Sequence, residues 1–184
     1  MTVSEIQKRL MVLPDAEQDY EFTYIDTDRK TYEDINSKGI VISSNDFKNM
    51  GDTNPAAVYN NILHKEHRTA DEERFLEWVI PQEPGHMVLE NSPLNDGAKA
   101  FRNLGRIAIY NHYNNIVKEL TAKIGRFQSS KPDPKTNTRD VDIWVVASAC
   151  GGTGSSNLLD ILYLINNISK LPVGFIFSVK ALYN

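Results

Sequence analysis

A short run of glycine and hydroxyl residues between two apolar segments constrains this chain more than any other feature. Residues 150–156 have the sequence CGGTGSS, and they lie between segment 142–147 (DIWVVA) and the apolar segment 157–168. The first segment predicts a buried strand and the second predicts a helix. Glycines allow the chain to turn sharply between them and allow a ligand to approach the backbone closely. The pattern therefore predicts a strand, a glycine loop and a helix in that order.

The rest of the chain predicts further helices and strands in alternation. Periodicity and capping signals predict helices over 3–13, 55–63, 70–79 and 101–124, with Gly125 as the C-cap of the last one. Alternating or continuous apolar residues predict strands over 20–25, 39–42 and 174–179. This alternation favours an α/β layered fold with a mostly parallel sheet. The first strand follows a helix, so we expect the chain to start one element late in such a fold.

Three loops of the chain are polar or contain glycine: 26–28, 97–102 and 151–156. Ligands of parallel α/β sheets bind at the carboxyl ends of the strands, and we expect all three loops to lie there or next to them. The start of the helix after Gly151 would offer free N–H groups and a favourable dipole to an anion such as phosphate. Hydroxyl donors at Thr153, Ser155 and Ser156 would add to it. The alternative is a turn that needs glycine for its geometry alone.

Standard phosphate motifs do not describe this loop. A P-loop requires a lysine directly after its last glycine, and none is present here; the dinucleotide fingerprint would require glycine where Asn157 stands.

Composition excludes several classes of function. The 20 Lys and Arg residues against 24 Asp and Glu give a net charge of −4, which argues against a nucleic-acid partner. A hydrophobic fraction of 41% argues against a disordered chain. No apolar run reaches the length of about 18–20 residues that crosses a bilayer, so we expect no membrane partner. The single cysteine, Cys150, fits a reducing cytoplasm.

The three loops together resemble the tubulin/FtsZ superfamily. Segment 149–165 (ACGGTGSSNLLDILYLI) resembles the GGGTG[ST]G signature and is closest to the GGTGSG version of bacterial tubulin-like proteins. Segment 20–34 (YEFTYIDTDRKTYED) resembles the second strand of FtsZ and the Asn-Thr-Asp corner that follows it. Segment 96–116 (DGAKAFRNLGRIAIYNHYNNI) resembles the family's glycine loop and the helix after it. Segment 31–95 has no match, and we interpret it as a family-specific insertion or specificity region.

The resemblance implies an incomplete Rossmann-like domain that binds GTP or GDP, with Mg²⁺ held indirectly. Its signature loop would hold the phosphates through Gly151, Gly152, Thr153, Gly154, Ser155 and Ser156. The loop before the long helix would contact the terminal phosphate through Gly97, Ala98 and Lys99. The corner after the second strand would lie near the phosphates and the magnesium, through Asp26, Thr27 and Asp28. No catalytic residue or direct metal ligand is assigned.

The chain also departs from the family pattern. Ser156 and Lys99 stand where glycines are usual, and the family's first strand, base-recognition residues and second domain have no counterpart here. The resemblance implies that the complete protein is a cytoskeletal GTPase that associates head to tail into filaments. We expect this chain not to hydrolyse GTP on its own.

Several residues allow two interpretations. Asp26 and Asp28 could hold Mg²⁺ through water or form an Asx turn. Arg102 could meet phosphate, whereas we interpret Arg106 as structural, and His64 with His67 as a solvated helix face.

Two other functions remain open from the sequence. Residues 148–152 (SACGG) match four positions of a caspase signature, which would make Cys150 a nucleophile with His112 as the candidate partner. Otherwise Cys150 is a small buried cysteine beside the loop. The second alternative is a nucleotide-free interaction module that keeps a tubulin-like fold.

Overall fold

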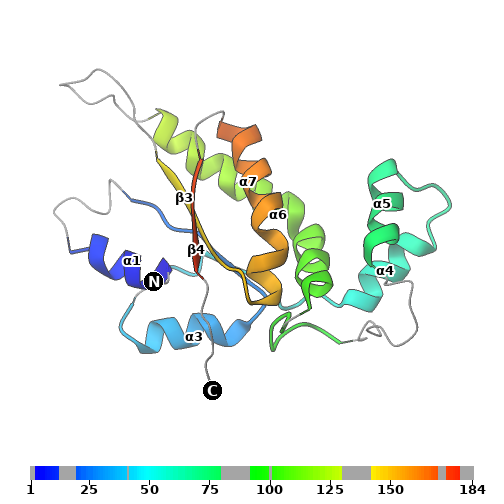
Figure 1. Ribbon diagram of the computed structural model, residues 1–184, viewed down its shortest axis with the longest axis horizontal. Helices are drawn as coiled ribbons and strands as arrows, with labels where there is room; N and C mark the ends of the chain where they lie inside the picture. Colours follow the sequence, from blue (N-terminus) through cyan, green and yellow to red (C-terminus); the bar gives the residue numbers. More distant parts are fainter. Residues whose placement is uncertain are drawn as a thin grey trace.

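The computed structural model describes residues 3–12, 20–40, 42–79, 92–99, 101–129, 142–169 and 173–178. Helices and strands alternate along much of this part of the chain, as predicted for an α/β protein (Figure 1). The helices are α1 (Val3–Leu10), α3 (Arg29–Ser37), α4 (Pro55–Leu63), α5 (Ala70–Val79), α6 (Arg102–Ser129) and α7 (Gly152–Ser169). The strands are β1 (Tyr24–Asp26), β2 (Phe47–Asn49), β3 (Ile143–Ser148) and β4 (Val173–Ser178).

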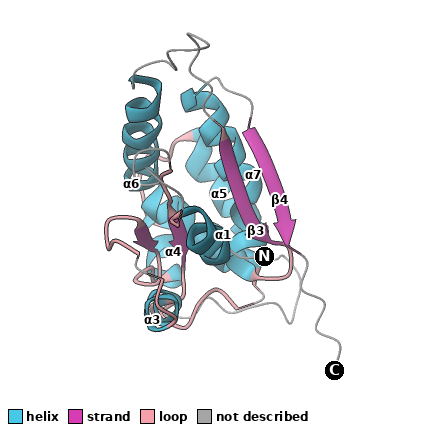
Figure 2. Ribbon diagram, turned by 90° about the vertical axis from the view of Figure 1, so that its left-hand side faces the viewer, coloured by secondary structure: helices cyan, strands magenta, loops and turns pink. Residues whose placement is uncertain are grey.

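The strands form two small parallel sheets. β1 pairs with β2, aligning Tyr24 with Phe47, and β3 pairs with β4, aligning Ile143 with Val173. Parallel neighbours need a crossover connection, which α3 supplies for the first pair and α7 for the second. Figure 2 shows β3 and β4 side by side, and α7 contacts both of them. Both pairs are parallel, as predicted, but the described strands form two sheets and not the single sheet expected from the sequence.

The long helix α6 forms the centre of the core. Its predicted apolar face is buried, each member being at most 9% exposed: Leu104, Ile107, Ala108, Ile116, Leu120 and Ile124. It packs against α7, α4 and α5 (Figure 1). The predicted C-cap at Gly125 is wrong, because α6 continues through this glycine to Ser129. A Cβ at Gly125 would meet no atom within 4 Å, so the helix passes this position without a steric conflict.

Local sequence signals set the bounds of α4 and α5. The Asn54 side chain accepts a hydrogen bond of 3.0 Å from the Ala57 N–H, and Pro55 occupies the first helical position. Before α5, the Thr69 hydroxyl accepts from the Glu72 N–H at 3.3 Å, and the Glu72 carboxylate accepts from the Thr69 N–H at 2.9 Å. This reciprocal pair is a capping box. Both helices have the predicted bounds.

The N-terminal sheet differs from the prediction. Strand β1 shares only residues 24 and 25 with the predicted strand 20–25 and extends to Asp26, which was predicted to lie in the corner after the strand. The predicted strand at 39–42 is absent among its described residues. Ile40 and Ile42 are instead buried in a small cluster with Tyr24. Their apolar character therefore serves the core without backbone pairing. The sequence did not predict β2, which pairs with β1 although it is only three residues long.

The C-terminal elements also differ in two respects. Strand β3 is not buried as predicted, since Trp144 is 63% exposed. Helix α7 begins at Gly152, five positions before the predicted start at Asn157, so most of the glycine run is helical. None of the helices in the described part of the chain combines the length and the apolar composition needed to span a bilayer.

Candidate functional site

Three segments that are far apart in the sequence meet at the side chain of Thr27. This residue follows β1 and has no exposed surface. Its Oγ1 lies 2.6 Å from Oγ1 of Thr153, in the first turn of α7, and accepts a 2.8 Å hydrogen bond from the Ala98 N–H. The corner 26–28, the turn 97–99 and the glycine run therefore form one cluster. As predicted, the corner and the glycine run follow strands, β1 and β3, and the turn 97–99 lies next to them.

The backbone of the turn 97–99 packs directly against the start of α7. The Gly152 N–H donates to the Lys99 carbonyl at 2.6 Å. A Cβ at Gly152 would lie 2.7 Å from the carbonyl oxygens of both Ala98 and Lys99, closer than real Cβ atoms approach other atoms. Position 152 therefore requires glycine because of the protein's own packing.

The turn itself contains two residues in the left-handed region. Gly97 has φ +83° and Lys99 has φ +52°. Glycine adopts this conformation without cost, whereas a lysine there is strained. The strain at Lys99 is notable because glycine is usual at this position in the FtsZ-type sequences that the segment resembles. Lys99 is exposed, and its carbonyl is the acceptor for Gly152.

The two aspartates of the corner bind backbone N–H groups. Asp26 accepts from the N–H groups of Thr27 at 2.7 Å and Asp28 at 3.2 Å, and from the Thr31 hydroxyl at 3.2 Å. Asp28 caps α3 by accepting from the Lys30 N–H at 2.9 Å. Asp26 thus forms the Asx turn that the sequence left open. Burial raises the pKa of Asp26 above its ordinary value, against the lowering effect of these donors.

The hydroxyl groups at the start of α7 form hydrogen bonds with other atoms of the protein. Thr153 contacts Thr27, Ser155 donates to the Gly151 carbonyl, and Ser156 donates to the carbonyl of Gly152 at 2.6 Å. The expected hydroxyl donors to a ligand are therefore occupied in this structure. In the first turn, the Gly152 N–H donates to the Lys99 carbonyl and the Ser155 N–H to the Gly151 carbonyl, which leaves the N–H groups of Thr153 and Gly154 as the donors to consider. The helix dipole adds positive potential there. An anion at this position would be bound mainly by backbone N–H groups.

Gly151 has no internal reason to be glycine. Its φ is not in the left-handed region, and a Cβ would meet no atom within 4 Å. The space beside its Cα is open. The absence of a side chain at this position lets a ligand approach the backbone closely.

The remaining arginine and histidine candidates have structural partners or lie apart. Arg106 is structural, as expected: it binds the Asp160 carboxylate at 3.1 and 3.3 Å and stacks 4.6 Å above the ring of Trp78. Arg102 begins α6 and is exposed. His64 and His67 are exposed, and the described residues contain no group of three or more potential metal ligands.

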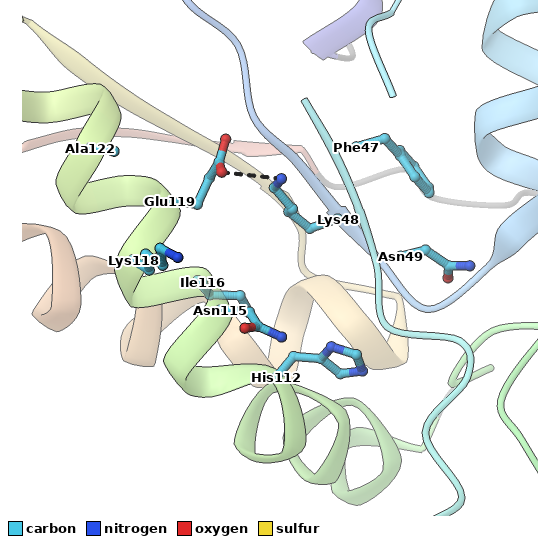
Figure 3. Close-up of a pocket in the computed structure, with 9 residues that line it drawn as sticks. All are labelled: Phe47, Lys48, Asn49, His112, Asn115, Ile116, Lys118, Glu119 and Ala122. Atoms are coloured by element: carbon cyan, nitrogen blue, oxygen red, sulfur yellow. Dashed lines mark ion pairs between the residues drawn. The ribbon is translucent and has the colours of Figure 1, made fainter. Parts of the chain in front are cut away.

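Cys150 and His112 are not brought together as a pair. Cys150 is exposed, so the prediction of a buried cysteine is wrong. Its N–H donates to the Ser148 hydroxyl at 3.3 Å. The His112 ring binds Asp52 at 2.8 Å and faces a groove between β2 and α6 (Figure 3). The structure therefore gives no support to the peptidase alternative.

The groove in Figure 3 has a volume of about 510 Å³ and does not include the candidate site. Lys48 and Glu119 form a 3.2 Å ion pair across it. A second hollow of about 520 Å³ lies beside α1, and the three loops do not line it either. Neither of these two hollows is therefore the candidate site.

Sequence reasoning missed two residues that hold these loops. Gly105, in the interior of α6, lies against the first turn of α7, and Asn157 is buried and bonded to the Gly105 carbonyl at 3.1 Å. A glycine inside a strongly helical pattern was the available signal, because it costs stability and so indicates a packing reason.

Comparison with known proteins identifies the family. Neither a curated protein nor a solved structure matches the chain. A family model described as "Tubulin like" matches residues 2–179, and this range contains all three converging segments. The chain therefore belongs to the tubulin-like family, which agrees with the resemblance seen in its three loops.

Proposed function

We propose that this domain binds a guanine nucleotide and holds its phosphates at the start of α7. The observation that carries the proposal is the contact of 2.6 Å between Thr27 and Thr153. Together with the bond from the Ala98 N–H, it unites the three segments to which the family resemblance assigns the phosphate site. None of the three segments alone would be specific for phosphate. A phosphate site of this kind requires all three segments to lie together, as they do at Thr27.

Each segment would have a distinct role. Backbone N–H groups at Gly151, Thr153 and Gly154 would bind phosphate oxygens. The exposed ammonium of Lys99 would stand beside the terminal phosphate. Asp26 and Asp28 would hold Mg²⁺ through water, since Mg²⁺ keeps several water ligands. We leave the Ser156 hydroxyl out of this set, because it binds the carbonyls of Gly152 and Thr153.

The proposal extends to the activity of the whole protein. Its fold would be Rossmann-like, and it would be a bacterial cytoskeletal GTPase in the cytoplasm. Head-to-tail contacts are heterologous and produce open filaments. In such a filament the next subunit would complete the hydrolytic site.

A binding experiment with two probes tests the proposal. Isothermal titration of the chain with GTP and with tripolyphosphate, both with Mg²⁺, separates phosphate binding from base recognition. We expect both probes to bind. Gly152→Ala should weaken tripolyphosphate binding about tenfold or more, because its Cβ must push the start of α7 away from the carbonyl oxygens of Ala98 and Lys99, and shifts of about 1 Å in a site have effects of this size or larger. Gly125→Ala is the matched control, because a Cβ there meets nothing within 4 Å.

A second variant separates ligand contact from protein packing. Gly151→Ala creates no contact within the protein, so it should leave the melting temperature unchanged while it weakens tripolyphosphate binding. Native-like binding by Gly151→Ala and Gly152→Ala would contradict the proposed phosphate loop. If the native chain binds neither probe, the proposal is overturned in favour of an interaction module without a nucleotide.

A further inference from the structure

Helices α6 and α7 pack closely at Gly105. A Cβ at this position would lie 2.6 Å from the Gly152 carbonyl oxygen and 3.0 Å from Cα of Thr153, and it would overlap Oγ of Ser156. The two helix backbones thus meet with no side chain from α6 between them. Glycine inside a helix costs about 1 kcal/mol relative to alanine, and α6 has 28 residues with Gly105 near its start. The close crossing offsets this cost.

A buried hydrogen bond spans the same crossing. The Asn157 side chain is buried, at 5% exposure for the residue, and its Nδ2 donates to the Gly105 carbonyl at 3.1 Å. The Ser156 hydroxyl lies 3.1 Å from Asn157 Oδ1 and 2.6 Å from the Gly152 carbonyl oxygen, and its single proton serves one of these acceptors at a time. The bond from Asn157 to Gly105 therefore ties α7 to the backbone of α6, whereas the Ser156 hydroxyl bonds within α7.

The start of α7 has little freedom on its other side. Gly152 donates to Lys99 at 2.6 Å, and Thr153 contacts Thr27 at 2.6 Å. Residues 152 and 153 are thus held between the α6 backbone and the turn 97–99. A shift of about 1 Å, which a Cβ at Gly105 would impose, would lengthen both bonds beyond normal hydrogen-bond distance.

We propose that Gly105 and Asn157 are positioning residues of the phosphate site: they set the place of residues 152–154 relative to the turn 97–99 without touching the ligand. This inference rests on the proposed function. It differs from simple helix packing in its consequence, because it predicts a loss of anion affinity in a protein that is still folded. If the crossing only contributes to packing, substitutions there lower stability and leave the affinity of the folded protein unchanged.

The experiment compares two glycines of the same helix. Tripolyphosphate with Mg²⁺ is titrated into Gly105→Ala and Gly125→Ala, well below their melting temperatures. We expect at least tenfold weaker binding for Gly105→Ala, in line with shifts of about 1 Å elsewhere, and native binding for Gly125→Ala. Asn157→Ala is the second variant, and it should also weaken binding. Adding Ser156→Gly to Gly105→Ala removes one of the overlapping atoms and should restore part of the affinity.

A spectroscopic readout follows the position of the loop directly. Cys150 is the only cysteine of the chain and is exposed beside Gly151, so it can carry a fluorine label. Without any ligand, the ¹⁹F signal should shift in Gly105→Ala and Asn157→Ala and stay in place in Gly125→Ala. A change of stability alone does not move this signal in a folded protein.

The outcomes separate this inference from the proposed function. Binding within twofold of native together with an unchanged ¹⁹F signal, in both Gly105→Ala and Asn157→Ala, would overturn the positioning role while the phosphate site stands. If the unmodified chain binds neither tripolyphosphate nor GTP, the proposed function fails, and the positioning role fails with it.

Discussion

The hydroxyl oxygens of Thr27 and Thr153 lie 2.6 Å apart, although 126 positions separate the two residues in the sequence. Because Oγ1 of Thr27 also accepts a hydrogen bond from the Ala98 N–H, this one oxygen atom connects the end of β1, the turn before α6 and the start of α7. Thr27 is fully buried, so its hydroxyl cannot reach a ligand. Its role is to hold together the groups that would.

Thr27→Val keeps the shape of the side chain and removes the hydroxyl. We expect the free energy of unfolding to fall by about 1–3 kcal/mol, because the Ala98 N–H and the Thr153 hydroxyl lose a buried partner. Chemical denaturation measures this change. Affinity for tripolyphosphate should fall in parallel, since the three segments lose their common contact.

The control for this substitution is Thr121→Val. Thr121 is exposed on α6, so the same chemical change should alter stability by no more than about 0.5 kcal/mol. Equal effects of the two substitutions would contradict the role assigned to Thr27.

Local signals explain which elements could be predicted from the sequence. Asn54 and Pro55 define the start of α4 through contacts within a few residues, and the observed helix begins where they indicate. The apolar face of α6 likewise follows from its periodicity. The convergence of the three loops was predicted from a shared sheet edge, but β1 and β3 belong to separate sheets, and the contacts of Thr27 with Ala98 and Thr153 bring the loops together instead.

Long-range contacts explain what could not be predicted. Strand β2 (FKN) has no strand pattern of its own and exists because it pairs with β1. Helix α7 starts in the glycine run, although glycine disfavours helix, because the crossing at Gly105 and the bond from Gly152 to Lys99 hold it there. The hydroxyl of Thr27 looked like part of a ligand corner. Only the structure shows that it faces inward.

Asp26 should make stability depend on pH. Burial raises its pKa above 3.8, so the folded state binds the proton more tightly than the unfolded chain does. The contribution of Asp26 to stability is therefore full below its unfolded pKa and is lost as the pH rises through the folded pKa. In the absence of Mg²⁺ and nucleotide, we expect Asp26→Asn to melt at the same or a higher temperature than native at neutral pH.

An amide at position 26 fits the observed partners. Its oxygen can accept from the Thr27 and Asp28 N–H groups, and its NH₂ can donate to the Thr31 hydroxyl. Asp71→Asn, which changes an exposed carboxylate on α5, should have little effect. A lower melting temperature of Asp26→Asn at neutral pH would show that the ionised carboxylate stabilises the fold.

Lys123 anchors the C-terminal half of α6 to the first sheet. Its Nζ donates to the Phe22 carbonyl at 2.6 Å, the Thr23 hydroxyl at 3.1 Å and the Asp46 carboxylate at 2.5 Å. Lys123→Met keeps the apolar stem and removes these donors. We expect unfolding in urea to require about 2 kcal/mol less, because partly buried acceptors lose a charged partner.

The matched control is Lys118→Met, on the same helix. Lys118 is exposed, and its replacement should change stability by no more than about 0.5 kcal/mol. If Lys123→Met were as stable as native, the bonds of its ammonium group would contribute nothing beyond the cost of burying it.

Tyr24 should make the protein sensitive to alkaline pH. Its ring is buried, at 8% exposure for the residue, and its hydroxyl donates to the Gln7 side chain at 2.5 Å. Burial, together with the nearby Asp46 carboxylate, raises the pKa of Tyr24 from 10.0 to about 12.

The contribution of Tyr24 to stability is therefore complete below pH 10 and is lost as the pH rises toward the folded pKa. In that window the unfolded chain releases a proton that the native state keeps, so the free energy of unfolding should fall by up to about 1.4 kcal/mol per pH unit.

Comparing urea denaturation of native protein and Tyr24→Phe between about pH 9 and about pH 12 isolates this effect, because other tyrosines titrate in both. The difference between the two curves should shrink as the pH rises, and curves that stay parallel would show that Tyr24 ionises equally easily in the folded state.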